Sequence, residues 1–167
     1  LVLSIIWRIN ARKYISSGTV ASAYDAWTQD KLLERLWGEH IHLGFYPSGE
    51  GGIDFRKAKE QFVHELVNWS GLDKLPRGSR ILDVGCGIGG SSRILSKYYG
   101  FNVTGVTISP AQVKRAIELT SNDLNCHFEV MDALNLKFED GEFDGIWSVE
   151  AGAHMNDKAR FANEMLR

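Results

Sequence analysis

Residues 82–90, Leu-Asp-Val-Gly-Cys-Gly-Ile-Gly-Gly, have the types and spacing that carry the strongest chemical signal in the sequence. Glycines let a backbone turn tightly and approach a ligand closely. An apolar, strand-like run at 80–84 precedes them and a helical pattern at 91–99 follows. The start of such a helix offers free N–H groups and a positive dipole end to an anionic group. A glycine-rich turn in this context predicts a site for a nucleotide-like ligand.

The glycine spacing alone leaves two ligand classes open. Gly85, Gly87 and Gly90 also fit the dinucleotide pattern G-x-G-x-x-G. Asp83 favours the other class, because a carboxylate there would face the amino group of a zwitterionic ligand and oppose a pyrophosphate. Thr107 stands where both classes often have an acid, and its presence weakens the dinucleotide interpretation more. The segment therefore predicts S-adenosylmethionine (SAM) as the cofactor, with a nicotinamide cofactor as the alternative.

Other candidate cofactor residues follow the predicted second and third strands. A carboxylate at Asp132 can accept from the exocyclic amine of adenine, and a loop aspartate that caps its own backbone is the alternative. Residues 109–112 could contact the ribose, although Ser109 is equally explained as a helix cap. The complete predicted cofactor set is Asp83, Gly85, Cys86, Gly87, Gly89, Thr107, Ile108, Gln112, Asp132, Ala133, Tyr24 and Tyr46.

The elements that must position these residues alternate along the chain. Strands are expected at 80–84, 102–107, 127–131 and 143–149, and helices at 54–70, 91–99, 109–120 and 157–166. This alternation predicts a parallel sheet wrapped by helices, with the ligand outside the carboxyl ends of the strands. We therefore expect an α/β, Rossmann-like SAM-dependent methyltransferase fold, truncated after the fourth strand, with an N-terminal helical cap.

Length and charge limit the remaining possibilities. The chain has 167 residues and a net charge of -2, which predicts one sizeable core and no nucleic-acid partner. We divide it into an apolar and then basic segment at 1–18, a helical cap or lid at 19–75, and a SAM-binding domain at 76–167 that is incomplete at its C-terminus. The first segment is expected to end a membrane anchor, with the chain on the cytoplasmic side. A short helix packed on a soluble cytoplasmic domain is the alternative.

Residues 82–90 and 105–116 resemble the tocopherol methyltransferases and their sterol methyltransferase relatives. The likeness extends to 20–25, 37–44 and 147–155, although Ala153 and Asn156 stand where family members often have proline. In that family a non-acidic residue at the end of the second strand is normal, which removes the objection from Thr107.

The resemblance implies a membrane-associated enzyme of tocopherol and plastoquinone synthesis. Its reaction would be methylation of a ring carbon of a lipid-like prenylated quinol of the 2-methyl-6-phytyl-1,4-benzoquinol type. Alternatives are a related methyltransferase that acts on γ-tocopherol or a sterol, and a SAM-binding module without turnover. The sequence does not fix the oligomeric state.

Two side chains after the fourth strand are the predicted catalytic residues. A quinol carbon becomes nucleophilic when the adjacent hydroxyl loses its proton, which calls for a base or acceptor beside it. We predict His154 in that role and Glu150 as the group that orients it, since an i, i+4 pair shares one face if the loop is helical. The alternative is a loop cap and a surface histidine.

The aromatic and histidine-rich cap has two interpretations. Tyr24, Trp37 and Tyr46 could stack near the positive sulfonium or pack the interior of the cap. Residues 39–42 contain Glu39, His40 and His42, which we interpret as part of a lid over the cofactor rather than as a metal site. No metal is predicted.

Overall fold

The sheet is parallel and has four strands. A computed structural model describes residues 17–47 and 52–167, so most of the predicted segment 1–18 lies outside the described residues. The strands are β1 (Arg80–Val84), β2 (Asn102–Thr107), β3 (Cys126–Val130) and β4 (Gly145–Trp147). They lie in the order β3-β2-β1-β4, with every pair parallel. The predicted parallel sheet is confirmed, and its carboxyl ends form one edge.

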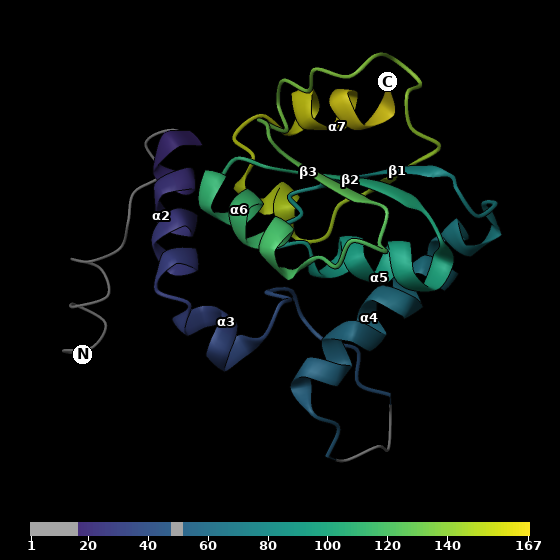
Figure 1. The fold of residues 1–167 in the computed structure, drawn as a ribbon. Coiled ribbons are helices and arrows are strands. Elements are labelled where there is room, and N and C mark those ends of the chain that lie inside the picture. The colour runs from purple at the N-terminus through teal and green to yellow at the C-terminus, as the bar shows by residue number, and fades with distance from the viewer. Residues whose placement is uncertain (1–16, 48–51) are drawn as a thin grey trace.

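Helices cover both faces of this sheet. Figure 1 shows α4 and α5 on one face and α7 on the other, with α2 beside α6 at one side. The helices are α2 (Ser17–Gln29), α3 (Leu32–Trp37), α4 (Phe55–Ser70), α5 (Gly90–Tyr99), α6 (Pro110–Leu119) and α7 (Lys158–Leu166), with short 3-10 turns η1 (Leu72–Lys74) and η2 (Ala151–His154).

Local capping chemistry sets several helix boundaries. The Asp54 carboxylate accepts from the backbone N–H groups at the start of α4, and Gly71 ends that helix in the left-handed conformation. Ser109 caps α6 and Pro110 takes its first position, as predicted. Asp157 caps α7 in the same way. These helix boundaries agree closely with the predicted ones, because a cap is formed by residues within one turn of the helix end and can be recognised in the sequence.

The third and fourth strands differ from their predicted ranges. β3 begins one residue earlier, and β4 covers three residues instead of seven. Before β4, the Asp144 carboxylate accepts from the Arg80 backbone N–H at 2.7 Å, so a side chain replaces a ladder bond. After β4, the Ser148 hydroxyl donates to the Val84 carbonyl, and the chain turns away towards η2. The predicted strand 143–149 was too long because the apolar residues on either side of β4 look like strand residues but do not pair with β1.

Strand β1 divides the core into two layers. Ile81 packs with residues of α4 and α5, whereas Leu82 and Val84 pack with the cluster beneath α7. This alternation follows from the period of a strand. Asp83 lies on the same side as Ile81 and is bonded to Ser92 of α5. The strand therefore holds a carboxyl group inside an otherwise apolar layer.

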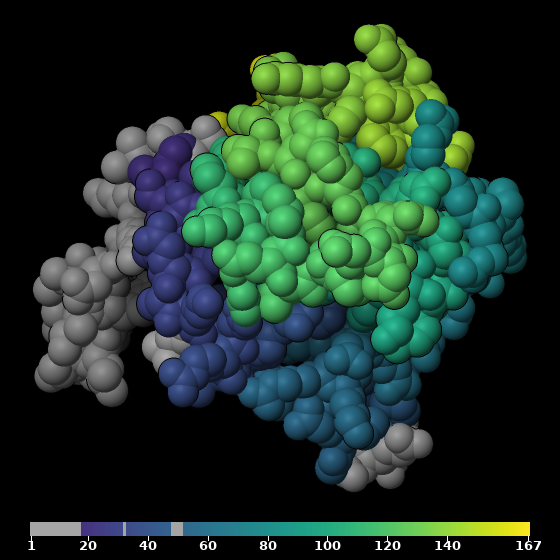
Figure 2. Space-filling model, in the orientation of Figure 1, coloured from purple at the N-terminus to yellow at the C-terminus, as the bar shows by residue number. Residues whose placement is uncertain are grey.

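The N-terminal cap is fixed to α6 by charged side chains. The Asp25 carboxylate accepts from the Ser109 hydroxyl and from the Ala111 N–H. Arg115 donates to both carboxylate oxygens of Glu34, at 2.8 and 2.7 Å. A two-bond arginine–carboxylate pair fixes orientation as well as distance. Figure 2 shows the cap, in purple and blue, against the green surface of α6.

The described helices are all too short or too polar to cross a membrane.

Gly105 in β2 provides a stability test. A Cβ built there would lie 2.7 Å from the Phe128 ring and 3.0 Å from the Cys86 Cβ, both within the core. Gly105→Ala is therefore expected to lower the free energy of unfolding in urea by about 1–3 kcal/mol through overpacking. Gly152→Ala is the control, because its Cβ would meet Phe161 at an ordinary 3.4 Å. Equal stability of the two variants would contradict this packing.

Candidate functional site

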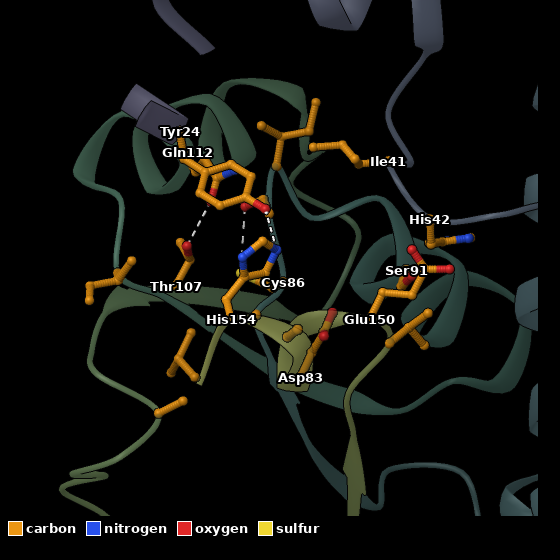
Figure 3. Close-up of a pocket in the computed structure, with 18 of the residues that line it drawn as sticks. Tyr24, Ile41, His42, Asp83, Cys86, Ser91, Thr107, Gln112, Glu150 and His154 are labelled. Atoms are coloured by element: carbon orange, nitrogen blue, oxygen red, sulfur yellow. Dashed lines mark hydrogen bonds between the residues drawn. The ribbon is translucent and has the colours of Figure 1, made fainter. Parts of the chain in front are cut away.

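A cavity of about 210 Å³ lies at the carboxyl edge of the sheet. One water needs roughly 10–15 Å³ by a comparable measure, so this space suits a ligand of many atoms. Figure 3 shows the labelled side chains converging on it from the cap, the glycine loop and η2. Of the predicted site residues, those lining the cavity are Tyr24, Asp83, Gly85, Cys86, Gly87, Thr107, Ile108, Gln112, Asp132, Ala133, Glu150 and His154.

The glycine loop closes over the end of β2. The backbone N–H groups of Gly85 and Cys86 both donate to the Val106 carbonyl, at 2.9 and 3.1 Å. Gly85 has a φ of 80°, and a Cβ there would lie 2.3 Å from the Ala151 Cβ. Only glycine lets the loop pass η2 this closely. The loop backbone is thereby brought to the cavity wall.

Gly89 and Tyr46 do not line the cavity, in contrast to their predicted roles. Gly89 is the left-handed N-cap of α5, and a Cβ there would lie 2.7 Å from the Phe128 ring. A glycine is needed at this position because the Phe128 ring leaves no room for a side chain. Tyr46 is exposed on the outer part of the cap. Sequence spacing could not distinguish these two positions from those that face the ligand space.

Asp83 is the most deeply buried charged group at the site, with 2% of its surface exposed. Its Oδ2 accepts from the Ser92 hydroxyl at 2.6 Å, and Figure 3 shows its carboxyl group directed towards the cavity. Burial raises the pKa of Asp83 to about 7, and the bond from Ser92 offsets this only in part. A cationic ligand group beside it would restore the charged form.

Polar contacts fix the predicted ribose and adenine positions. The Thr107 hydroxyl donates to the Gln112 side-chain oxygen at 2.7 Å, with both side chains buried. The Asp132 Oδ1 accepts from the Leu134 N–H at 2.9 Å. The backbone-capping alternative for Asp132 is thus present, and the same residue also lines the cavity.

Tyr24 and His154 meet across the cavity. The Tyr24 hydroxyl lies 3.0 Å from the His154 Nε2, and their rings pack edge to face. Figure 3 shows the pair above Asp83. Burial raises the pKa of Tyr24, which keeps its hydroxyl protonated and able to donate. The phenol group of Tyr24 therefore contacts His154, the residue predicted to accept the proton of the quinol hydroxyl.

Glu150 has a different partner from the one predicted. Its Oε1 accepts from the Leu43 backbone N–H at 3.1 Å, and Figure 3 shows Glu150 and His154 on opposite sides of the cavity. The loop forms a 3-10 turn with about three residues per turn, so positions i and i+4 do not share a face. Glu150 also has a φ of 58°. The side chain that contacts His154 is Tyr24.

The segment Glu39–Leu43 crosses the cavity wall; we call it the strap. The buried Lys59 ammonium donates to the Trp37 and His40 carbonyls, and Arg93 pairs with Glu39. His40 and Ile41 both line the cavity. Within the part of the chain that the structure describes, no three His, Cys, Asp or Glu side chains form a group that could hold a metal. The role of this segment as a lid over the cofactor stays a prediction.

Sequence reasoning missed an apolar half of the cavity wall. Its members lack a chemical signature, because core residues and ligand-facing residues of this type look alike in sequence. They include Val20, Val106, Met131, Trp147, Val149 and Met155. Strand periodicity could have placed Val106 and Trp147 near the edge, but not their contact with the cavity.

Two curated relatives share much of this chain. It is 60% identical over 162 residues to the 2-methyl-6-phytyl-1,4-hydroquinone methyltransferase of Synechocystis sp., a match that covers 97% of this chain and 51% of that protein. It is 40% identical to the chloroplastic tocopherol O-methyltransferase of Arabidopsis thaliana, over 81% of this chain and 42% of that protein. The chain therefore spans about half the length of these relatives, and its predicted resemblance to the tocopherol methyltransferases is confirmed.

Solved structures share the fold. The [4+2]-cyclase SpnF superposes with a TM-score of 0.79 at 25% identity, over 91% of this chain and 57% of that one. The phosphoethanolamine-type N-methyltransferase 2 of Haemonchus contortus, solved with S-adenosylhomocysteine, gives a TM-score of 0.63 at 26% identity, over 79% of this chain and 28% of that one. The Rossmann-like methyltransferase fold is confirmed, and the cyclase indicates that the fold alone does not define the reaction.

A family model described as a methyltransferase domain matches residues 81–167, from the second residue of β1 to the last residue of the chain. That range contains the sheet, the glycine loop, Asp83 and His154. Because it covers more than half of the 167 residues, the chain belongs to the methyltransferase domain family.

Proposed function

We propose that the protein is a SAM-dependent methyltransferase that methylates a ring carbon of a prenylated quinol. The observation that carries this proposal is one cavity in which a buried carboxyl group, Asp83, and a phenol-binding histidine, His154, face the same ligand space. The 60% identity to a protein named for such a quinol supports the acceptor class.

The residues of the cavity fit SAM. Asp83 is a buried carboxyl group with one hydroxyl partner, and a ligand ammonium would provide the charge that its environment lacks. Neither lysine nor arginine is among the described residues that line the cavity, which disfavours the pyrophosphate of a dinucleotide. We infer that Asp83 and the loop 85–87 hold the amino-acid part, and that Thr107, Gln112 and Asp132 face the nucleoside.

The chain's contribution to the reaction is positioning and proton removal. When bound, SAM supplies an electrophilic methyl group on a positive sulfonium. The acceptor must lie in line with that group and lose a hydroxyl proton, and an unperturbed phenol has a pKa of about 10. We infer that the quinol hydroxyl takes the place that the Tyr24 hydroxyl occupies on His154 Nε2.

The test is transfer of labelled methyl to lipid. With full-length protein, labelled SAM and 2-methyl-6-phytyl-benzoquinol, label is expected in a dimethyl phytyl-quinol. His154→Ala should reduce turnover by roughly 10²-fold or more, the usual contribution of general base catalysis. Tyr24→Phe keeps the ring, removes the hydroxyl that contacts His154, and should cost less. Label in no lipid, with S-adenosylhomocysteine binding intact, would exclude the quinol reaction.

Two other functions are separated by the same assay. The Arabidopsis relative is named as a tocopherol O-methyltransferase, so γ-tocopherol is included as a second acceptor. Label in the tocopherol product alone would identify γ-tocopherol as the acceptor in place of the quinol. Binding without any transfer would identify a SAM-binding module.

Asp83 makes cofactor affinity depend on pH. Its pKa is raised to about 7 in the free protein, and a ligand ammonium should bind the carboxylate form. A proton must therefore be released on binding below pH 7, and the affinity for S-adenosylhomocysteine should fall about tenfold per pH unit from pH 7 to 5.5. Calorimetry across this range measures it. Asp83→Asn should bind more weakly and with a flat profile; a steep profile in that variant would contradict the assignment.

We also propose that the protein works at a membrane surface facing the cytoplasm, because its acceptor is a lipid. Large apolar side chains of the cap are exposed at Leu36, Trp37, Ile41, Leu43, Phe45 and Tyr46. Ile41 also lines the cavity, so this surface continues into the ligand space. Aromatic side chains beside the basic residues Arg35 and Arg56 are typical of a membrane interface.

A flotation experiment checks this contact. The double variant Leu43→Ser, Tyr46→Ser should bind at least about tenfold less to phosphatidylglycerol–phosphatidylcholine vesicles, because each apolar side chain contributes about 1–3 kcal/mol on full burial. Trp69→Ser is the matched control, since Trp69 is 85% exposed at the end of α4 and is not part of the exposed apolar group at 36–46. An equal loss of binding in the control would contradict a membrane contact centred on residues 36–46.

A further inference from the structure

Two histidines of the strap form a hydrogen-bonded pair that the proposed reaction does not use. His40 Nδ1 lies 3.1 Å from His42 Nε2, and their rings pack edge to face. Both side chains are buried, His40 with 9% of its surface exposed. Buried imidazoles in contact need defined protonation states, because each ring nitrogen is either a donor or an acceptor.

The contacts of the pair determine its tautomers. His42 Nδ1 lies 2.8 Å from the Leu43 carbonyl oxygen. A carbonyl only accepts, so the proton of His42 is on Nδ1 and its Nε2 carries a lone pair. That Nε2 must accept from His40, which places the His40 proton on Nδ1. The Nε2 of His40 is therefore a lone-pair acceptor.

The charges around the pair favour this neutral state. The pKa of His40 is lowered to about 3, mainly by burial and to a smaller extent by the nearby His42, Arg93 and Lys59. Burial also lowers the pKa of His42, against the opposing effects of its bond to Leu43 and of the Glu150 carboxylate. An imidazole with so low a pKa is a poor base, but its unprotonated nitrogen can still accept a hydrogen bond.

The acceptor nitrogen belongs to a side chain that lines the cavity. His40 is one of the cavity-lining residues, and its ring lies over Gly90, where a Cβ would be 2.8 Å from the His40 Cε1. Within residues 17–47 and 52–167, every fully buried side-chain nitrogen or oxygen has a hydrogen-bond partner. No described residue forms a hydrogen bond with His40 Nε2, so this nitrogen is not fully buried, and the open space that His40 lines is the cavity.

We propose that His40 is a ligand-positioning residue whose Nε2 accepts a hydrogen bond from a donor group of the bound ligand. The donor is an N–H of the SAM ammonium or the hydroxyl of the acceptor, and this identity rests on the proposed function. His42 fixes the ring of His40, and the Leu43–Glu150 bond fixes the backbone that holds His42. This gives Glu150 a positioning role that does not involve His154.

Nitrogen-15 spectra of the histidine rings test the proposal directly. In the ligand-free chain at pH 7.5, His40 and His42 should both be neutral and carry their proton on Nδ1. An Nε2 proton on His40 would overturn the proposal without any ligand. His64, bonded to Tyr99 at 2.8 Å and outside the cavity, is the internal reference and should not respond to ligand.

Ligand addition distinguishes the two donors. Saturating S-adenosylhomocysteine should move the His40 Nε2 resonance upfield if the ammonium donates, and only added quinol should move it if the hydroxyl donates. An unchanged resonance with both ligands bound overturns the proposal. Absence of S-adenosylhomocysteine binding by calorimetry would instead overturn the proposed cofactor.

Substitutions separate positioning from packing. If the ammonium is the donor, His40→Leu should weaken S-adenosylhomocysteine binding by roughly 10- to 100-fold, the value of a bond to a charged group. If the hydroxyl is the donor, the loss should appear in KM for the quinol. His40→Gln places an oxygen near the Nε2 position and should restore most of the loss. Equal defects in the two variants would indicate packing alone and overturn the proposal.

Discussion

The structure of the site depends on the burial of one carboxyl group at the end of β1. Asp83 lies between the apolar layer of α4 and α5 and the ligand space, and among the described residues Ser92 is its one hydrogen-bond partner. A buried carboxyl group with so little support disfavours the unliganded fold at neutral pH, because the folded state holds a proton that the unfolded chain has released. The buried carboxyl group thus lowers the stability of the unliganded fold while it serves ligand binding. Residues that lower stability in this way are concentrated at functional sites.

The cap turns an open sheet edge into an enclosed site. Without α2 and the strap, the cavity would lack Tyr24, His40 and Ile41, leaving the ends of the strands open on one side. Asp25 and the Glu34–Arg115 pair fix α2 and α3 on α6, which follows the same strand that supplies Thr107. The helix that carries Gln112, a proposed ribose contact, is thus also the support of the cap.

Local signals explain what could be predicted from the sequence. The strand–glycine–helix pattern, the Ser109-Pro110 cap and the alternation of elements are each encoded within a short stretch of sequence. They located the sheet edge and most of the polar residues that line the cavity. The Tyr24–His154 bond joins residues 130 positions apart, and the Glu150–Leu43 bond joins residues 107 apart. Such pairings depend on how the cap sits on the sheet, which no local pattern specifies. The i, i+4 argument for Glu150 and His154 failed because it assumed an α-helical turn.

The polar groups of the cavity select for one sign of charge. Asp83 offers a carboxylate, and His40 a lone pair, while the nearby cations Arg93 and Lys59 are used by Glu39 and by backbone carbonyls. A positive ligand gains from this arrangement, and a ligand that has lost positive charge gains less. Methyl transfer from a sulfonium removes one positive charge from the cofactor. The cavity that favours binding of the positively charged methyl donor therefore binds its neutral thioether product less tightly. The same electrostatic arrangement thus promotes both cofactor binding and product release in the proposed reaction.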